Sequence, residues 1–305
     1  MKRNRGRYRS IHERERKSDH TEWALKMLNN TLEDLSIKKL KEICKEYEIP
    51  GYGTKNEIAK RIKKNLLYET YSFQKGDKEI FFKDYRFDFI FEKIKMESDF
   101  YEHELLDKIA KHVKKGTIGI DVGGHIGNHT TFLVKISELR KVYVFEPRKP
   151  LASLILENAK LNKISEKIVL NKDGISALSS NCGTFRFEKR KNYNLGTGRI
   201  LKEHGDVKVS TIDKLFQDTT DEISIIKVDV EGLEREVLKG ARETIEKHNP
   251  TISVESLVKS ENQKDHDEAK KIILDIIGPN KYKLKFTYGA LPGPFTYLFS
   301  SNVVK

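Results

Sequence analysis

The residues best able to do chemistry surround a glycine-rich stretch, Thr117–Phe132, which reads TIGIDVGGHIGNHTTF. A β-branched apolar run, Ile118–Val122, comes first, and apolar residues resume after the glycines. A glycine-rich turn from a strand into a helix lets a ligand approach the backbone and directs helix N–H groups at any anionic part of it. The stretch predicts a ligand-binding loop, although a simple strand-to-helix connection has the same pattern.

A carboxylate after the next apolar run favours a nucleoside ligand. Lys141–Phe145 reads as a second strand and ends at Glu146, where a carboxylate accepts hydrogen bonds from both ribose hydroxyls of an adenosine. Asp121 precedes the first glycine, where its charge would repel a pyrophosphate but could orient an ammonium group through bound water. The sign of this charge favours S-adenosylmethionine over a dinucleotide.

Five segments of the chain resemble the FkbM family of S-adenosylmethionine-dependent methyltransferases. They are FYE at 100–102, DVGGHIGN at 121–128, VFEPRK at 144–149, STIDKL at 210–215 and IKVDVEGLEREVLKGA at 226–241. The resemblance covers residues 82–303 and implies an α/β fold, a doubly wound, mostly parallel, seven-stranded Rossmann-like methyltransferase sheet. It places the class I methyltransferase domain at 99–305. His125 departs from the Asn that the family usually carries.

Pattern and resemblance together give a set of expected cofactor contacts. Glu102 would stand at the edge of the ligand, although a carboxylate that complements a helix dipole explains it equally well. Asp173 would accept a hydrogen bond from the adenine amine, with a plain Asp-Gly turn as the alternative. The full set is Glu102, Asp121, Gly123, Gly124, His125, Gly127, Asn128, Glu146, Pro147, Asp173 and Gly174.

The apolar run Ile223–Val230 supplies the predicted catalytic groups. We place it beside the strand at 118–122, in the centre of the sheet. If its backbone stays extended, Asp229 and Glu231 point the same way, at the mouth where ligands bind in doubly wound sheets. The resemblance implies O-methylation, and a hydroxyl acceptor must lose its proton. Asp229 is the predicted base or orienting group, and Glu231 is the second candidate unless it complements the helix that follows. His103 is the third candidate. No metal is predicted.

The composition limits which classes of protein this chain can belong to. The 305 residues are 37% hydrophobic and 34% charged, which suits a soluble globular chain. No apolar run is long enough to span a bilayer, and the basic start MKRNRGRYRS lacks the hydrophobic segment of a secretory signal. We therefore expect an intracellular, cytoplasmic protein without a membrane partner. Cys44 and Cys182 lack metal-ligand spacing, so neither a disulfide framework nor a zinc module is expected.

The charge is concentrated at the N-terminus. The net charge is +12, and residues 1–31 begin with a dense run of Lys and Arg. Such an arm cannot bury apolar area, so we predict that it is flexible and contacts phosphates without sequence preference. A merely solubilising arm is the alternative.

Residues 32–67 resemble the SAP motif, a helical hairpin common in nucleic-acid enzymes. Ser36 can cap a first helix, the turn IPGYGTK follows at 49–55, and Thr54 with Glu57 forms a capping box for a second helix. The resemblance implies phosphate contacts near the N-terminus of the second helix. The candidates are Lys39, Gly53, Thr54, Lys55, Lys60, Arg61 and Lys63. A hairpin that docks another protein is the alternative.

Residues 68–98 are expected to form a linker and added edge structure. Further along the chain, residues 183–188 and 207–210 are predicted to be paired strands, residues 233–247 one helix, and residues 282–287 with 296–301 a terminal hairpin.

The leading hypothesis is an S-adenosylmethionine-dependent O-methyltransferase acting on a hydroxyl of, or brought near by, a nucleic acid, either RNA or DNA, with the RNA ribose as the obvious candidate. One alternative is an FkbM-type O-methyltransferase of a sugar or other small hydroxylated molecule, tethered by the basic module. Another is a non-catalytic nucleic-acid-binding protein on a methyltransferase fold.

Overall fold

The computed structural model describes residues 32, 35–46, 50–62, 68–85, 88–171, 174–175, 184–187, 198–201, 207–258 and 260–302. The chain divides into two compact units, one made of Met1–Thr70 and Asp84–Glu92 and the other of Tyr71–Lys83 and Lys93–Lys305. None of the helices within the described ranges combines the length and the apolar character needed to cross a bilayer.

The first unit contains the two predicted helices, α2 (Ile37–Glu46) and α3 (Lys55–Ile62). The predicted capping box is present, because the Thr54 N–H and hydroxyl donate to Glu57 Oε2 at 2.7 and 2.9 Å and the Glu57 N–H donates back at 3.4 Å. The apolar faces of the helices pack together through Leu40, Ile43, Cys44, Ile58, Ala59 and Ile62, all of them buried.

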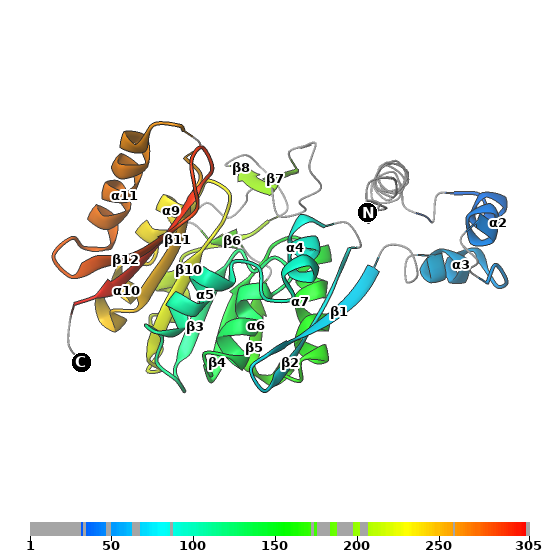
Figure 1. Cartoon of the computed structure of the whole chain (residues 1–305), viewed down its shortest axis with the longest axis horizontal. Coiled ribbons are helices and arrows are strands. Elements are labelled where there is room, and N and C mark those ends of the chain that lie inside the picture. Colours follow the sequence, from blue (N-terminus) through cyan, green and yellow to red (C-terminus); the bar gives the residue numbers. More distant parts are fainter. Residues whose placement is uncertain are drawn as a thin grey trace, which may run out of the picture. The chain divides into compact units, whose positions relative to one another are not determined.

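The second unit is built on a seven-stranded sheet with the strand order β12-β13-β11-β10-β3-β4-β5 (Figure 1). Strands β5, β4, β3, β10 and β11 run parallel, while β13 is antiparallel to both β11 and β12. The predicted doubly wound, mostly parallel fold is thereby confirmed. The strands are β3 (Ile118–Val122), β4 (Lys141–Phe145), β5 (Ile168–Asn171), β10 (Ile223–Val228), β11 (Thr251–Ser256), β12 (Tyr282–Tyr288) and β13 (Phe295–Ser301).

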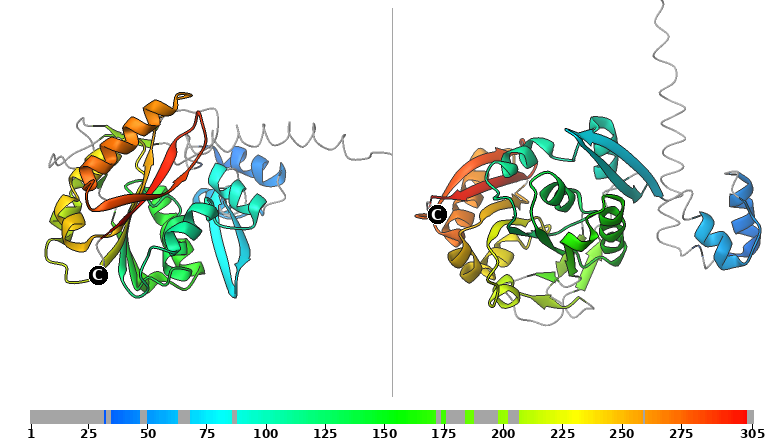
Figure 2. Two further views of the ribbon diagram at one scale, coloured as in Figure 1. Left: turned by 60° about the vertical axis from the view of Figure 1, so that its left-hand side comes forward. Right: turned by 90° about the horizontal axis from the view of Figure 1, so that it is seen from below.

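Strands β3 and β10 lie side by side in the middle of the sheet, as their apolar sequences predicted, and every residue of both is buried. Helices flank the sheet (Figure 2), with α6 packed on β3 and β4, α7 on β5, and α9 and α11 on β11. The helices of this unit are α5 (His103–Ala110), α6 (Asn128–Lys135), α7 (Lys149–Leu161), α8 (Ile212–Phe216), α9 (Glu234–Lys239), α10 (Arg242–His248) and α11 (Gln263–Ile277).

One predicted helix, residues 233–247, is two helices in the structure, α9 and α10. The break falls at Gly240, whose carbonyl accepts the Asp213 N–H at 2.9 Å. Asp213 Oδ1 in turn accepts the N–H and the hydroxyl of Thr244, each at 2.8 Å. The STIDKL segment therefore holds the start of α10 in place, a tertiary contact that the helical periodicity of α9 and α10 does not reveal.

The region between β5 and β10 pairs differently from the expectation. Residues 183–188 and 207–210 were expected to pair with each other, but β7 (Thr184–Phe187) pairs with β8 (Gly198–Leu201). Strand β9 (Val209–Ser210) pairs instead with β6 (Gly174–Ile175). The predicted pairing was wrong because the glycine-containing segment at 198–201 is itself extended and lies closer in sequence to β7.

Residues 68–98 form a separate hairpin, β1 (Tyr68–Lys75) and β2 (Lys78–Tyr85), followed by helix α4 (Phe89–Glu97). Asn158 of α7 and Asn162, which caps the end of that helix, satisfy the backbone of β2. Asn158 binds the N–H and C=O of Lys83 at 2.7 and 3.1 Å, and Asn162 binds those of Phe81 at 3.0 and 2.6 Å. Side-chain amides on a helix thus take the place of a neighbouring strand, so the hairpin adds no strand to the main sheet.

Candidate active site

The glycine turn after β3 brings two backbones into close contact. Gly123 has a φ of +86°, and a Cβ there would lie 1.8 Å from the carbonyl oxygen of Asp229. At Gly124 a Cβ would lie 2.3 Å from Val144 Cγ1. Only glycine fits at these positions, because a side chain would push β3 away from β10 and β4. The end of β10 is thereby fixed directly against the loop.

Three N–H groups of this turn serve the fold itself. Those of Gly123 and Gly124 both donate to the carbonyl of Phe145, at 2.9 and 3.2 Å, and that of His125 donates to Glu146 Oε2 at 3.0 Å. The expectation that the turn directs free N–H groups at an anion is therefore not met by these three. Their bonds instead hold the loop on the end of β4.

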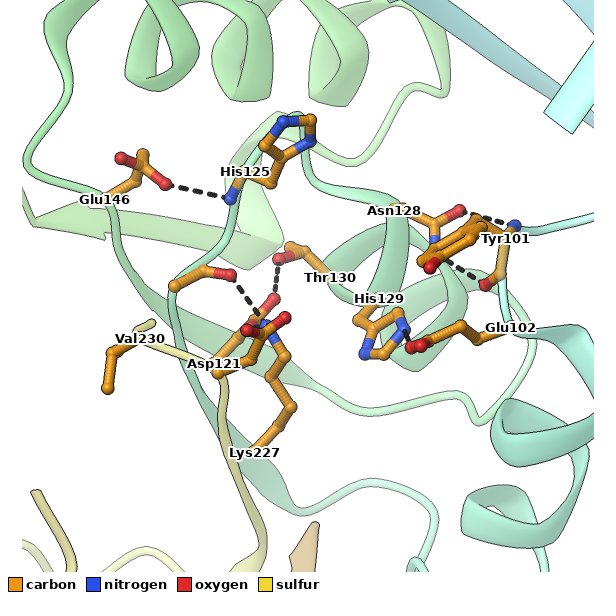
Figure 3. A network of polar contacts seen from close by, with 12 residues as sticks. Tyr101, Glu102, Asp121, His125, Asn128, His129, Thr130, Glu146, Lys227 and Val230 are labelled. Atoms are coloured by element: carbon orange, nitrogen blue, oxygen red, sulfur yellow. Dashed lines mark hydrogen bonds and ion pairs between the residues drawn. The ribbon is translucent and has the colours of Figure 1, made fainter. Parts of the chain in front are cut away.

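Glu146 is almost fully buried and its carboxylate accepts four hydrogen bonds. Oε1 accepts the backbone N–H and the Nε–H of Arg148 at 3.0 and 2.8 Å. Oε2 accepts the His125 N–H and the Nη2–H of Arg148, both at 3.0 Å. Figure 3 shows Glu146 beside the His125 backbone, at the end of the glycine turn. Glu146, the residue predicted to bind ribose, is bound here by the chain's own Arg148.

Asp121 does not face an open cleft. Its carboxylate is fully buried, with Oδ2 accepting the Thr130 hydroxyl at 2.5 Å and Oδ1 lying 3.2 Å from Lys227 Nζ. Lys227 also donates to the Gly123 carbonyl at 2.6 Å (Figure 3). The predicted role of orienting a ligand ammonium therefore needs correction, because the ammonium beside Asp121 is that of Lys227, its cross-strand partner. Asp121 neutralises a buried lysine.

The charge of Lys227 is secured by its neighbours. Burial by itself lowers the pKa of a lysine, but the carboxylates of Asp121 and Asp229 outweigh it and raise the pKa of Lys227 above its usual range. Asp229 Oδ2 lies 3.6 Å from Lys227 Nζ, and the Asp229 side chain is 40% exposed. A buried cation thus links the carboxylate of β3 to the partly exposed one after β10.

The segment before α5 is tied to the start of α6. Asn128 clamps the backbone of Tyr101, donating to its carbonyl at 3.0 Å and accepting its N–H at 3.2 Å. Glu102 has a left-handed backbone with a φ of +59° and makes no side-chain cap to α5. Its carboxylate lies 3.1 Å from Nε2 of His129 (Figure 3). Asn128 and Glu102, both expected to contact the cofactor, bind each other's segments in the structure.

A second carboxyl group accompanies Asp229. The parallel register pairs Val228 with Val254, so Asp229 and Glu255 follow the ends of adjacent strands. The two side chains share a hydrogen bond. Burial, then the Asp229 charge, raise the pKa of Glu255 well above its usual value, and Glu102 and Glu231 add to this. Glu255 therefore keeps its proton and can donate it in a hydrogen bond to Asp229.

The phenol of Tyr101 belongs to the same group. Burial raises the pKa of Tyr101 above its usual range, and the carboxylates of Glu102, Asp229 and Glu255 add to that shift. The hydroxyl therefore stays protonated and can donate a hydrogen bond. Three acidic side chains and a phenol thus converge at the carboxyl ends of β10 and β11.

Glu231 does not lie as predicted. Strand β10 ends at Val228, and Glu231 has a left-handed φ of +58°, so the chain from 229 to 231 is not extended. Glu234 shapes this turn by accepting the N–H of Gly232 at 2.7 Å and that of Val230 at 3.4 Å. Burial raises the pKa of the Glu234 carboxyl. Side chains alternate in direction only along an extended strand, so Asp229 and Glu231 do not share a direction in the way that the sequence predicted.

The other predicted residues lie further from this group or outside the described part. Asp173 and Lys63 fall outside the described residues, and Gly174 begins the short strand β6. Pro147 lies between Glu146 and Arg148. His103, a third candidate base, lies 3.9 Å from Asp99 Oδ2.

The predicted phosphate contacts of the helical hairpin are partly engaged within it. Arg61 donates to the carbonyls of Pro50 and Tyr52 and stacks on the Tyr52 ring, 4.5 Å from its centroid. The Glu57 carboxylate sits at the N-terminus of α3, bound to Thr54 and next to Gly53. Of the lysines, Lys39 pairs with Glu42 at 3.2 Å, Lys55 is half-buried and Lys60 is exposed.

Sequence reasoning missed Glu255, Arg148, Lys227, His129 and Thr130 as parts of this site. A signal existed for Lys227, because a lysine inside a mainly apolar, buried strand needs a buried counter-charge. None existed for Glu255, since only the pairing of β10 with β11 brings it to Asp229.

The Methyltransferase FkbM domain family matches residues 121–282, more than half of the 305-residue chain. The chain belongs to the FkbM methyltransferase family. A curated relative, the hexuronic acid methyltransferase AglP of Haloferax volcanii, is 28% identical over 154 residues, which are 50% of this chain and 61% of AglP. This FkbM methyltransferase thus spans less than two thirds of the length of that relative.

Solved structures with a similar fold include the methyltransferase FkbM from Methylobacillus flagellatus, at 19% identity and a TM-score of 0.40, covering 60% of this chain and 43% of that one. An rRNA methylase from Streptococcus thermophilus is 16% identical with a TM-score of 0.41, covering 66% of this chain and 95% of its own. The predicted FkbM membership is confirmed by the family match.

Proposed function

We propose that this FkbM methyltransferase uses S-adenosylmethionine to methylate a hydroxyl group, with Asp229 as the base or orienting group. The observation that carries the proposal is the contact between the glycine turn and the end of β10. Because a Cβ on Gly123 would lie 1.8 Å from the Asp229 carbonyl, the carboxylate that follows β10 stands directly beside the loop predicted to bind the cofactor.

The residues in place suit an adenosyl cofactor. The turn after β3 has no room for side chains at Gly123 and Gly124. The buried carboxylate of Glu146 follows β4, which is the position of ribose recognition in such sheets. Glu146, Gly123 and Gly124 would hold the nucleoside. S-adenosylmethionine, when bound, supplies an electrophilic methyl group with a good leaving group. The protein then has to position the acceptor hydroxyl, exclude water and receive a proton.

The chain's own groups can receive that proton. Asp229 is 40% exposed, so an acceptor can reach it, and the protonated Glu255 beside it holds the carboxylate in place. Lys227 Nζ lies 3.6 Å from Asp229 Oδ2 and counters part of its charge. The Asp229 carboxylate can accept the proton as the hydroxyl oxygen bonds to the methyl group.

The chemistry of the mouth favours a sugar-like acceptor. Glu102 and Asp229 can accept hydrogen bonds from hydroxyl groups, and these carboxylates would repel a phosphate placed close to the reacting atom. AglP, the curated relative, is named for a hexuronic acid substrate. A carbohydrate hydroxyl is therefore the preferred acceptor class.

A nucleic-acid hydroxyl is the second candidate. The net charge of +12 and the exposed lysines of the helical hairpin, such as Lys60, favour a polyanionic partner. The engagement of Arg61 and Glu57 within the hairpin reduces the number of groups there that could meet a phosphate. A nucleic acid would have to bind with its phosphates away from the acidic mouth.

Incubation with methyl-labelled S-adenosylmethionine and a panel of glycosides, hexuronic acids, RNA and DNA tests both candidates. We expect the labelled methyl group to appear in a carbohydrate. The Asp229→Asn variant should not transfer the label, while titration calorimetry should show that it still binds S-adenosylhomocysteine. Label in RNA or DNA alone would select the second candidate. Full turnover by the Asp229→Asn variant would refute the assignment of the base.

A further inference from the structure

The carboxylate predicted to bind ribose is already fully occupied. A carboxylate offers about four lone-pair directions. In Glu146 two accept backbone N–H groups, from His125 and Arg148, and two accept the Nε–H and Nη2–H of the Arg148 guanidinium. No acceptor direction remains for a ribose diol.

The two kinds of donor differ in what a ligand can displace. The backbone N–H groups of His125 and Arg148 are fixed by the turn and by the chain after β4. The guanidinium is the end of a flexible side chain with five donors and a fork that matches a carboxylate. It mimics the diol, because both present two parallel donors to the same pair of oxygens. Only the guanidinium can leave without unfolding the loop.

We propose that Arg148 is an internal competitor for the cofactor, a side chain that occupies the ribose-binding oxygens of Glu146 and must leave when the nucleoside binds. This inference rests on the proposed use of S-adenosylmethionine. Glu146 would then exchange two charged donors for two hydroxyls while its two backbone bonds persist.

In the ligand-free protein, Arg148 stabilises the buried carboxylate of Glu146. A carboxylate as buried as Glu146 is costly without a partner, and the Arg148 fork at 2.8 and 3.0 Å supplies one. The same fork lowers the affinity for any ligand that needs those oxygens, because only the fraction of molecules with the guanidinium released can bind. Arg148 thus stabilises the empty site at the expense of cofactor affinity.

The decisive measurement is calorimetric binding of S-adenosylhomocysteine to wild type and to Arg148→Met. Methionine keeps most of the apolar stem and both backbone donors to Glu146, and it removes the guanidinium. If the guanidinium is released in about a tenth of the molecules, the variant binds about tenfold more tightly. Arg140→Met is the matched control, since Arg140 pairs with Asp221 at 2.7 Å, before β4 rather than after it. Its affinity should equal that of wild type.

A ligand analogue separates competition from other effects. The gain from Arg148→Met should vanish for S-adenosylhomocysteine lacking both ribose hydroxyls, and it should vanish in a Glu146→Gln background. Should Arg148→Met not fold, Arg148→Lys replaces the fork by a single ammonium and should still bind more tightly than wild type. Equal or weaker binding by these variants, with wild type binding normally, overturns the inference. Absence of binding by wild type instead refutes the proposed function.

Discussion

Lys227 and Asp121 are cross-strand partners in the centre of the sheet, with Lys227 Nζ 3.2 Å from Asp121 Oδ1 and both side chains buried. The same ammonium donates to the Gly123 carbonyl at 2.6 Å and lies 3.6 Å from Asp229. One buried cation therefore connects the strand before the glycine turn, the turn itself and the predicted base.

Removal of this cation should destabilise the fold. Lys227→Met leaves the buried Asp121 carboxylate without its counter-charge, and we expect a loss of about 3 to 5 kcal/mol in the free energy of unfolding. Urea denaturation measures it. Lys239→Met, which removes a lysine from the exposed pair with Glu236, should cost less than about 1 kcal/mol. Addition of Asp121→Asn to Lys227→Met should recover part of the loss. Wild-type stability in Lys227→Met would show that the pair is unimportant.

The close approach at Gly123 gives a second test. Gly123→Ala places a Cβ 1.8 Å from the Asp229 carbonyl at a φ of +86°, so we expect a destabilisation of about 2 to 5 kcal/mol and a loss of S-adenosylhomocysteine binding. Gly116→Ala is the matched control, with a φ of +75° and no atom within 4 Å. It should cost about 1 to 2 kcal/mol from backbone strain alone and leave binding intact. Equal effects of the two substitutions would argue against the close approach.

The proton shared by Asp229 and Glu255 makes stability depend on pH. Because the folded pKa of Glu255 is raised above its ordinary value of 4.5, its contribution is fully present below that value and is lost as the pH rises through the raised pKa. We expect the stability of wild type to fall over this window. Glu255→Gln keeps a donor for Asp229 and has no proton to lose, so its stability should fall less. The measurement is the denaturation midpoint of wild type and of Glu255→Gln at a series of pH values. If the two midpoints change with pH in the same way, Glu255 does not hold the shared proton.

Nucleic-acid binding by the helical hairpin can be separated from its folding. Removal of one lysine that binds a phosphate lowers the slope of log affinity against log salt by about one. Lys39→Gln with Lys60→Gln should therefore lower this slope by about two if both lysines bind phosphates. Arg61→Gln should instead lower the thermal stability of the hairpin, because Arg61 holds the carbonyls of Pro50 and Tyr52. Binding of oligonucleotides at several salt concentrations is the measurement. An unchanged slope in the double variant would remove these lysines from the interface.

Local sequence signals predicted much of the fold. The capping box of Thr54 and Glu57 is formed within one helical turn, so residue type alone reveals it. The mainly apolar runs of β3 and β10 predicted two central strands, because near-continuous apolar sequence is typical of a strand covered on both faces. The predicted terminal hairpin is also present, as β12 and β13.

Other features depend on which strands become neighbours. Glu255 joins Asp229 through the register of β10 with β11, and Asn158 reaches Lys83 across 75 positions in the chain. Glu146 and Arg148 are close in sequence, but only the folded chain shows that the guanidinium lies on the carboxylate. Neither periodicity nor spacing reveals contacts of this kind.

Residue types within short stretches were enough to establish the family, the glycine turn and the strand ends that carry Glu146 and Asp229. The partners of those side chains became known only from the folded chain. Asp121 was expected to face a ligand and instead neutralises Lys227, and Glu231 leaves the strand direction at a left-handed turn. Buried charges take their partners from adjacent strands, and strand order and register arise from the packing of the whole sheet, so no local pattern can specify them.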